Sequence, residues 1–175
     1  ERLDHRGGVV PHLLRHGVRR LELVVLTHPD SDHIGGAAAV FESFHVGAVV
    51  ATGLPAGKAY YLDALRAAHR GEVRWIAARP DMEVVVDDVV LRFLHPPEAK
   101  LDVADDANEV SVAFGLEYGA FRALFLGDAY SDAEQEMVER YGEEMRADLL
   151  KVGHHGSRTS TSETLLRAAR PRIAV

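Results

Sequence analysis

Four side chains able to bind a metal ion fall within the six residues His28-Pro29-Asp30-Ser31-Asp32-His33. Imidazole nitrogen together with hard carboxylate oxygen suits Zn²⁺, Mn²⁺ or iron. The chain contains no cysteine, which excludes both a disulfide framework and a thiolate zinc site. The spacing therefore favours a divalent metal site over a solvated acidic turn with two incidental histidines.

Two other polar groups follow apolar runs further along the chain. Asp128 follows one apolar run, directly after Gly127. His154 and His155 follow another apolar run, directly after Gly153. A Gly-Asp pair alone favours a plain turn. Because side chains alternate along a strand, only one of the paired histidines is expected to face a site. We favour His154 as a ligand and His155 as a proton donor, and the two roles can be exchanged.

The elements that position these residues alternate between strand-like and helix-like patterns. Each cluster follows a predicted strand, which suits a site at strand ends. Strands are predicted at 21–26, 46–51, 73–76, 83–86, 89–95, 110–118, 121–126, 149–152 and 173–175. Helices are predicted at 34–44, 55–69, 132–141 (with Ser131 as its cap) and 160–169, and a loop at 96–108. This alternation predicts a layered α/β fold.

Composition narrows the class of protein. The 175 residues, 47% apolar and 27% charged, predict one soluble globular domain over 1–175. A net charge of −7 argues against an extended duplex-binding surface. The longest uncharged apolar run, 34–41, is far shorter than the ~20 residues of a membrane span.

Two segments carry a resemblance to a known family. Residues 27–36 resemble the second signature of the metallo-β-lactamase superfamily, usually His-x-His-x-Asp-His, with Asp30 in place of the second histidine. This form, and the paired histidines before Gly-Ser within 149–157, resemble the extracytoplasmic domain of ComEC-type DNA-uptake proteins. The resemblance implies an αββα sandwich of two mixed sheets flanked by helices. It also implies that a first strand with an Asp-x-Gly turn and a histidine-containing C-terminal segment are missing.

The resemblance implies a site with two divalent ions. The carboxylate of Asp30 gives this site a hard oxygen ligand in place of an imidazole nitrogen, which favours Mn²⁺, with Zn²⁺ as the alternative. Asp128 resembles the bridging aspartate, and Asp32 is a candidate for orienting the attacking water. The resemblance implies that one ion is bound by His28 and Asp30, that the other is bound by Asp32, His33 and His154, and that Asp128 is shared. The candidate catalytic residues are Asp32, Asp128 and His155.

Other residues are candidates for metal or substrate contact. Asn108 stands where other superfamily members place a ligand histidine, although an Asn that caps its own backbone is an equal alternative. The further candidates are His155, Lys151, Ser157 and Arg158. The segment 158–160 could also hold a phosphate at the start of the last predicted helix, with plain capping as the alternative.

The implied function is that of a metal-dependent phosphodiesterase or nuclease that degrades single-stranded DNA during natural transformation. The alternatives are a hydrolase of another ester, a lactam or a phosphocholine-type phosphodiester, and a non-catalytic binding domain of a DNA-uptake channel. The expected partners are single-stranded DNA and the membrane-channel portion of a larger chain, at the extracytoplasmic face of the cytoplasmic membrane. The sequence leaves the oligomeric state open.

Overall fold

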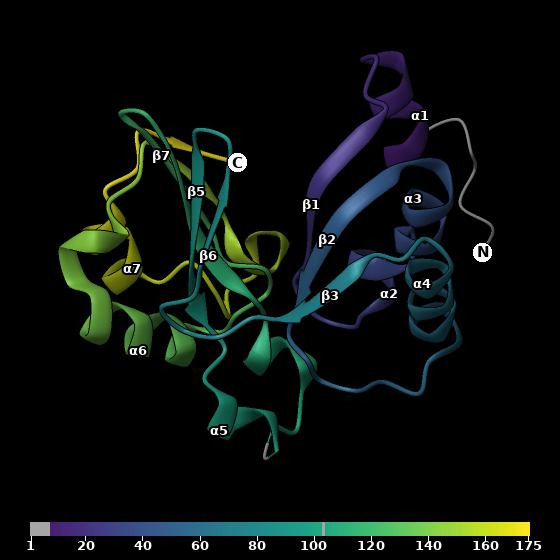
Figure 1. Cartoon of the computed structure of the whole chain (residues 1–175). Helices are drawn as coiled ribbons and strands as arrows, with labels where there is room; N and C mark the ends of the chain where they lie inside the picture. The colour runs from purple at the N-terminus through teal and green to yellow at the C-terminus, as the bar shows by residue number, and fades with distance from the viewer. Residues whose placement is uncertain (1–7, 103) are drawn as a thin grey trace. The chain divides into compact units, whose positions relative to one another are not determined.

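The structure is a computed structural model that describes residues 8–102 and 104–175. The chain divides into two compact units, the first ending at Ala77 and the second running from Ala78 to Val175. Each unit has its own sheet, helices and hydrophobic core (Figure 1). The expected α/β class, with two sheets flanked by helices, is confirmed, and a single hydrolase domain over 1–175 stays a prediction.

The first unit is built on a parallel sheet. Its strands have the order β1-β2-β3, with Val24 paired to Val49 and Val49 to Trp75. Helices α3 and α4 lie side by side along this sheet (Figure 1). The strands are β1 (Arg20–Leu26), β2 (His45–Ala51) and β3 (Arg74–Ala77), and the helices are α1 (Val9–Arg15), α2 (Ser31–Ile34), α3 (Ala37–Ser43) and α4 (Ala59–Arg70).

Small side chains allow the helices of this unit to pack closely on the sheet. Ala64, Ala67 and Ala68 of α4 are buried in one cluster with Val49 and Ile34. Burial of apolar surface of this kind supplies the main stabilising free energy of the unit. The core therefore forms directly beside the segment that carries His28 and His33.

The second unit is built on a mixed sheet of the order β4-β5-β6-β7-β8-β9, antiparallel from β4 to β7 and parallel from β7 to β9. Its strands are β4 (Glu83–Val86), β5 (Val89–His95), β6 (Ala113–Tyr118), β7 (Phe121–Phe125), β8 (Leu149–Lys151) and β9 (Ile173–Ala174). Its α-helices are α5 (Glu98–Leu101), α6 (Ser131–Tyr141) and α7 (Glu163–Ala169), and its 3₁₀ helices are η1 (Ala107–Val110), η2 (Gly142–Met145) and η3 (Gly153–Gly156).

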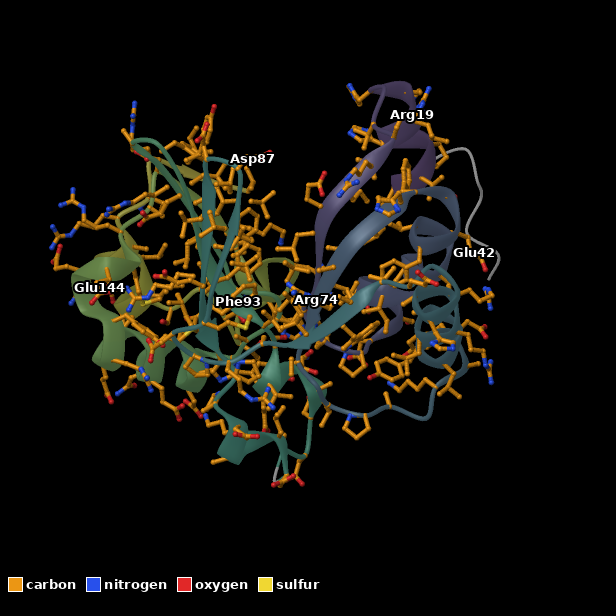
Figure 2. The ribbon with its side chains drawn as sticks, in the orientation of Figure 1. Arg19, Glu42, Arg74, Asp87, Phe93 and Glu144 are labelled. Carbon is orange, nitrogen blue, oxygen red and sulfur yellow. The ribbon has the colours of Figure 1, made fainter. Side chains whose placement is uncertain are left out.

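Tight turns and an apolar interior explain the second sheet. Asp87 and Gly119 have positive φ angles of 50° and 59°, which the two hairpin turns require. Asp87 marks the β4–β5 turn, whereas Phe93 lies fully buried within the unit (Figure 2). Leu124 and Leu150 pack in the core with helix α6.

The predicted helices differ from the structure at their beginnings. The helix predicted over 34–44 is interrupted, because Ile34 ends the short helix α2 and α3 begins only at Ala37. Between them, the backbone of Gly35 lies so close to the Ser31 carbonyl oxygen that a Cβ would collide with it, so only glycine fits there. The helix predicted from Pro55 begins at Ala59, and the one predicted from Ser160 begins at Glu163, after Thr161 with a φ of 57°.

Two smaller expectations are also corrected. Ser131 does not cap helix α6, because the N-cap is Tyr130 and no side chain caps that end. The segment 96–108, predicted as a loop, contains α5 and the start of η1. Within residues 8–102 and 104–175, no helix combines the length and hydropathy needed to cross a bilayer.

One buried carboxylate links the two main helices of the second unit. Glu134 in α6 is fully buried, and its two oxygens accept backbone hydrogen bonds from Thr161 at 2.5 Å and Ser162 at 2.7 Å. The hydroxyl of Thr161 accepts a hydrogen bond from the backbone N–H of Gly153 at 3.0 Å. Glu134 therefore holds the end of the loop that carries His154 and His155, and the Thr161 hydroxyl ties the start of that loop to its end.

We expect Glu134→Gln to lower the free energy of unfolding by about 1.5–3 kcal/mol, because hydrogen bonds to a charged group contribute about that much. One oxygen of the carboxylate becomes an NH₂ group that faces a backbone donor. Urea denaturation followed by circular dichroism measures the change. Glu136→Gln on the same helix is the control, because Glu136 makes an exposed ion pair with Lys100. Equal losses in the two variants would contradict the anchoring role.

Candidate metal centre

The segment from Thr27 to His33 follows strand β1 at its carboxyl end. His28 is 2% exposed, and His33 lies in the short helix α2. The two imidazole rings lie 3.9 Å apart between centroids. The short helix and the strand end thus bring the two histidines together, as the spacing predicted.

The hydroxyl of Thr27 orients both rings. Its Oγ1 lies 3.1 Å from Nδ1 of His28 and 3.1 Å from Nδ1 of His33. A hydroxyl oxygen carries two lone pairs and can accept from both Nδ1–H groups. Nε2 is then the nitrogen that each ring presents for metal binding, and a partner at the other ring nitrogen is typical of ligand histidines.

The carboxylates of this segment lie at ligand spacing from those nitrogens. Two ligands bound tetrahedrally at about 2.1 Å from one ion stand roughly 3.4 Å apart. Nε2 of His28 lies 3.8 Å from Oδ2 of Asp30, and Nε2 of His33 lies 3.7 Å from Oδ2 of Asp32. The four predicted residues of the first unit therefore fit a divalent cation.

Lys58, which the sequence reasoning missed, contacts the same segment. Its Nζ donates a hydrogen bond to Oδ1 of Asp30 at 3.0 Å, and this bond raises the pKa of Lys58 above its ordinary value. The hydroxyl of Tyr60 donates to the carbonyl oxygen of Pro29 at 3.1 Å. No local pattern signals Lys58, because 28 residues separate it from Asp30.

Asp128 is the centre of a second cluster, in the second unit. It follows β7 and is 4% exposed. Its Oδ2 lies 3.4 Å from Nε2 of His155 and 3.9 Å from Nε2 of His154. These separations also fit ligands of one cation.

The backbone of the paired histidines explains why both rings face Asp128. His154 and His155 lie in η3 with φ angles of 46° and 52°, in the left-handed region. The expectation that strand alternation turns one ring away is wrong, because β8 ends at Lys151. The assignment of His154 as the ligand and His155 as the proton donor stays a prediction.

Asn108 lies in a network that fits a ligand role. Its Nδ2 donates to the hydroxyl of Tyr130 at 3.1 Å, and that hydroxyl donates to Asp106 at 2.7 Å. The bond to Asp106 raises the pKa of Tyr130. Oδ1 of Asn108 is buried without a hydrogen-bond partner among the described residues. An amide oxygen is a weak ligand for a hard cation, so Asn108 remains a candidate metal or substrate contact.

His95 and Ser111 support the Asp128 turn. Oγ of Ser111 accepts a hydrogen bond from the backbone N–H of Asp128 at 3.1 Å. Nδ1 of His95 lies 2.9 Å from the carbonyl oxygen of Ser111 and donates to it. Burial lowers the pKa of His95 from its ordinary value. A neutral His95 thus holds the strand beside Asp128.

The remaining candidates have local roles in the structure. Nζ of Lys151 donates to the carbonyl oxygen of Val152 at 2.9 Å, and Oγ of Ser157 lies 3.0 Å from Oγ1 of Thr159. Arg158 is exposed. The expected phosphate position at a helix start is wrong for 158–160, because α7 begins at Glu163 with Ser162 as its N-cap.

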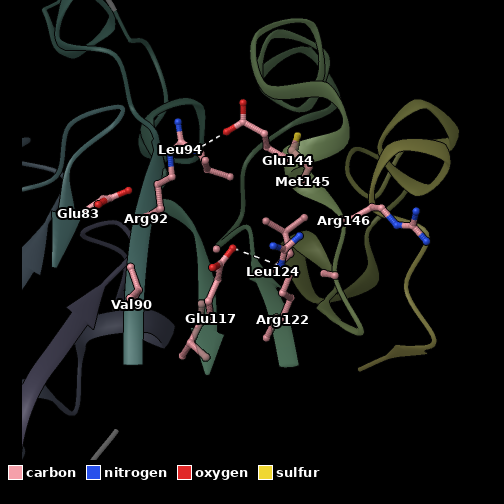
Figure 3. Close-up of a pocket in the computed structure, with 14 residues that line it drawn as sticks. Glu83, Val90, Arg92, Leu94, Glu117, Arg122, Leu124, Glu144, Met145 and Arg146 are labelled. Atoms are coloured by element: carbon pink, nitrogen blue, oxygen red, sulfur yellow. Dashed lines mark hydrogen bonds and ion pairs between the residues drawn. The ribbon is translucent and has the colours of Figure 1, made fainter. Parts of the chain in front are cut away.

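A groove on the second unit contains none of the predicted site residues. Its volume is about 270 Å³, and Leu94, Gly115 and Leu124 line its floor. Two of its three arginines form ion pairs, Arg92 with Glu144 and Arg122 with Glu117, and Arg146 is the third (Figure 3). The chemistry-bearing residues therefore lie outside the groove.

The class of protein follows from the fold, the site and sequence comparison together. The family model described as "Metallo-beta-lactamase superfamily" matches residues 2–175. The chain belongs to this superfamily. The resemblance inferred from residues 27–36 is thereby confirmed.

The curated proteins that this chain resembles indicate which branch of the superfamily it is similar to. Competence protein ComA of Neisseria gonorrhoeae is 36% identical over 96% of this chain and 21% of its own length. ComE operon protein 3 of Bacillus subtilis (strain 168) is 29% identical over 95% of this chain and 21% of its own length. The chain therefore spans about a fifth of the length of these relatives, and its ComEC-type resemblance is confirmed.

A solved structure supports the fold. CmlA, a diiron β-hydroxylase from Streptomyces venezuelae, aligns with a TM-score of 0.57 and 13% identity over 90% of this chain and 35% of its own length. At this identity the similarity concerns the fold alone. Because a hydroxylase shares this fold, the fold alone does not determine which reaction this chain catalyses, and the site residues decide it.

We expect Thr27→Val to weaken metal binding by about 10–100-fold, the usual cost of removing a group that orients ligand histidines. Valine keeps the volume of threonine but removes the oxygen shared by His28 and His33. Isothermal titration with Mn²⁺ measures the affinity, and Thr27→Ser is the control that keeps the hydroxyl. Affinity unchanged in Thr27→Val would show that Thr27 does not orient the ligands.

We expect His95 to make stability depend on pH. The unfolded chain binds a proton at the ordinary pKa of 6.5, and the folded chain binds it only at lower pH. The stabilisation is therefore complete above pH 6.5 and is lost as the pH falls toward the folded pKa, by at most about 1.4 kcal/mol per pH unit. His95→Asn retains a donor for Ser111 but no titration. Urea denaturation at pH 7.5 and 5.5 should show a smaller loss in this variant, and equal losses would contradict the prediction.

Proposed function

We propose that the chain is the hydrolytic part of a two-metal phosphodiesterase that degrades single-stranded DNA during natural transformation. The observation that carries the proposal is the ligand-like spacing of imidazole nitrogens and carboxylate oxygens in both clusters, at 3.4–3.9 Å. The names of the relatives, which are competence proteins, support the biological setting.

Six residues are the proposed ligands. The two carboxylates of the first cluster and that of Asp128 supply hard oxygen, which supports Mn²⁺ ahead of Zn²⁺. Asn108 is a further candidate. Within the first unit the proposed ligands are His28, Asp30, Asp32 and His33, and within the second unit they are Asp128 and His154.

Two bound divalent ions would supply an activated water and polarise the phosphoryl group. The protein's own residues then have separate tasks. Thr27 holds the two imidazole rings in the orientation that binding requires. Asp32, with a side chain 63% exposed, accepts a hydrogen bond from the attacking water. His155, with a side chain 56% exposed, donates a proton to the leaving oxygen.

The substrate and the setting are inferred from chemistry and from the relatives. A net charge of −7 does not support a broad duplex-binding surface, so a single strand that reaches the site locally is the better substrate. We infer that the chain is part of a longer DNA-uptake protein, because it spans about a fifth of the length of Competence protein ComA and of ComE operon protein 3. The proposal that it acts on the extracytoplasmic side of the membrane rests on the ComEC-type resemblance.

We expect the chain loaded with Mn²⁺ to cleave a fluorescent single-stranded oligonucleotide, with activity abolished by a chelator and restored by Mn²⁺. Asp128→Asn should lower kcat by roughly 100-fold or more, a loss typical for removal of one charge-stabilising group at a reaction centre. Asp132→Asn, an exposed aspartate on α6, is the matched control and should retain full activity.

Other outcomes would replace the proposal. Turnover of a lactam, a thioester or a phosphocholine diester without cleavage of single-stranded DNA would assign the site to another hydrolase reaction. Binding of less than one equivalent of Mn²⁺ or Zn²⁺ would favour a non-catalytic binding domain. Anomalous scattering from metal-soaked crystals would identify the ions and their ligands.

A further inference from the structure

Lys58 is held beside the proposed metal ligands by a contact between distant parts of the first unit. Its Nζ donates to Oδ1 of Asp30 at 3.0 Å, across 28 residues of sequence. Lys58 precedes helix α4, and Asp30 precedes helix α2. The contact therefore depends on the tertiary fold and not on helix spacing.

The two oxygens of Asp30 face different partners. Oδ1 faces the ammonium of Lys58, whereas Oδ2 lies 3.8 Å from Nε2 of the buried His28. A cation bound through Oδ2 and His28 leaves the Oδ1 contact with Lys58 in place. Lys58 is therefore a neighbour of the ligand set and does not occupy the ligand position.

Lys58 retains the capacity to bind a further group. An ammonium has three N–H donors, and its side chain is 57% exposed. When a divalent cation draws on the Asp30 carboxylate, that carboxylate neutralises the ammonium less. The positive charge then becomes available to an anion at the edge of the site.

The Lys58–Asp30 pair differs from an ordinary ion pair on the protein surface in what lies next to it. Arg66 and Asp63 form such a pair at 2.9 Å on the exposed side of α4, with side chains 65% and 60% exposed. Pairs of this kind contribute about 0–1 kcal/mol to stability. Lys58 differs because its partner is a candidate metal ligand, and its compact ammonium is a charge that phosphate oxygens bind well.

We propose that Lys58 is a substrate-binding residue that contacts a non-bridging phosphate oxygen of the phosphodiester, next to the ion held by His28 and Asp30. The inference rests on the proposed function, because it names the group of the substrate that this part of the site recognises. Lys58 adds a fixed positive charge to the ions and makes the site selective for anionic phosphoryl groups over neutral esters or lactams.

Inorganic phosphate tests this role without any cleavage reaction. Isothermal titration, or broadening of the phosphorus resonance by protein-bound Mn²⁺, gives its dissociation constant for the Mn²⁺-loaded chain. We expect Lys58→Ala to weaken phosphate binding by roughly 10–100-fold, the range for loss of one charge-assisted hydrogen bond. Lys58→Arg should retain most of the affinity, and Arg66→Ala should retain all of it.

A second measurement separates substrate binding from support of Asp30. Electron paramagnetic resonance of unbound Mn²⁺ gives the metal affinity, which we expect Lys58→Ala to retain or raise, because the ammonium competes with the cation for the charge of Asp30. An unchanged phosphate affinity, or a parallel loss of Mn²⁺ affinity, would overturn the role of Lys58. If the chain binds phosphate through Lys58 but leaves single-stranded DNA intact, the DNA substrate is wrong and the role of Lys58 stands.

Discussion

The second unit depends on the buried carboxylate of Glu134. A charge without solvent is tolerated only where hydrogen bonds replace its hydration. Here two backbone N–H groups, those of Thr161 and Ser162, supply that replacement. The carbonyl oxygen of Ala129, just after Asp128, accepts a hydrogen bond from Ser160 at 2.6 Å. The Asp128 turn and the histidine loop are therefore held by the same helix–loop junction.

The first unit uses a neutral group for a similar purpose. The single oxygen of Thr27 contacts both imidazole rings, so the orientation of one ring is coupled to that of the other. In both units the residues that offer metal ligands stand on short turns, and their neighbours in longer elements restrict those turns. Preorganisation of this kind reduces the entropy that would be lost when a cation binds.

The strands and the chemistry-bearing residues were readable from the sequence because both depend on local patterns. The apolar run before His28 and the short apolar runs on either side of Asp87-Asp88 predicted strands that the structure contains. The residues at which helices begin were harder to predict from the sequence. The helix predicted over 34–44 is interrupted at Gly35 and Gly36, and no periodicity reveals this interruption. The orientation of His155 depends on a left-handed backbone that only the folded loop specifies. Lys58 and Glu134 escaped notice because their partners lie 28 and 27 residues away.

The mixed topology of the second sheet bears on the order in which this unit assembles. Strands β4 and β5, and likewise β6 and β7, join through short hairpin turns. The connection from β5 to β6 carries α5 and η1, and the parallel pairing of Leu124 with Leu150 closes a loop that includes α6. Loop-closure entropy makes such non-local pairing a late step in folding. The Asp128 turn and the paired histidines meet only after this step, so we expect their contacts to form after the transition state. A cation bound there would consequently slow unfolding far more than it accelerates folding. The metal would thus stabilise the folded second unit kinetically, by lowering its rate of unfolding.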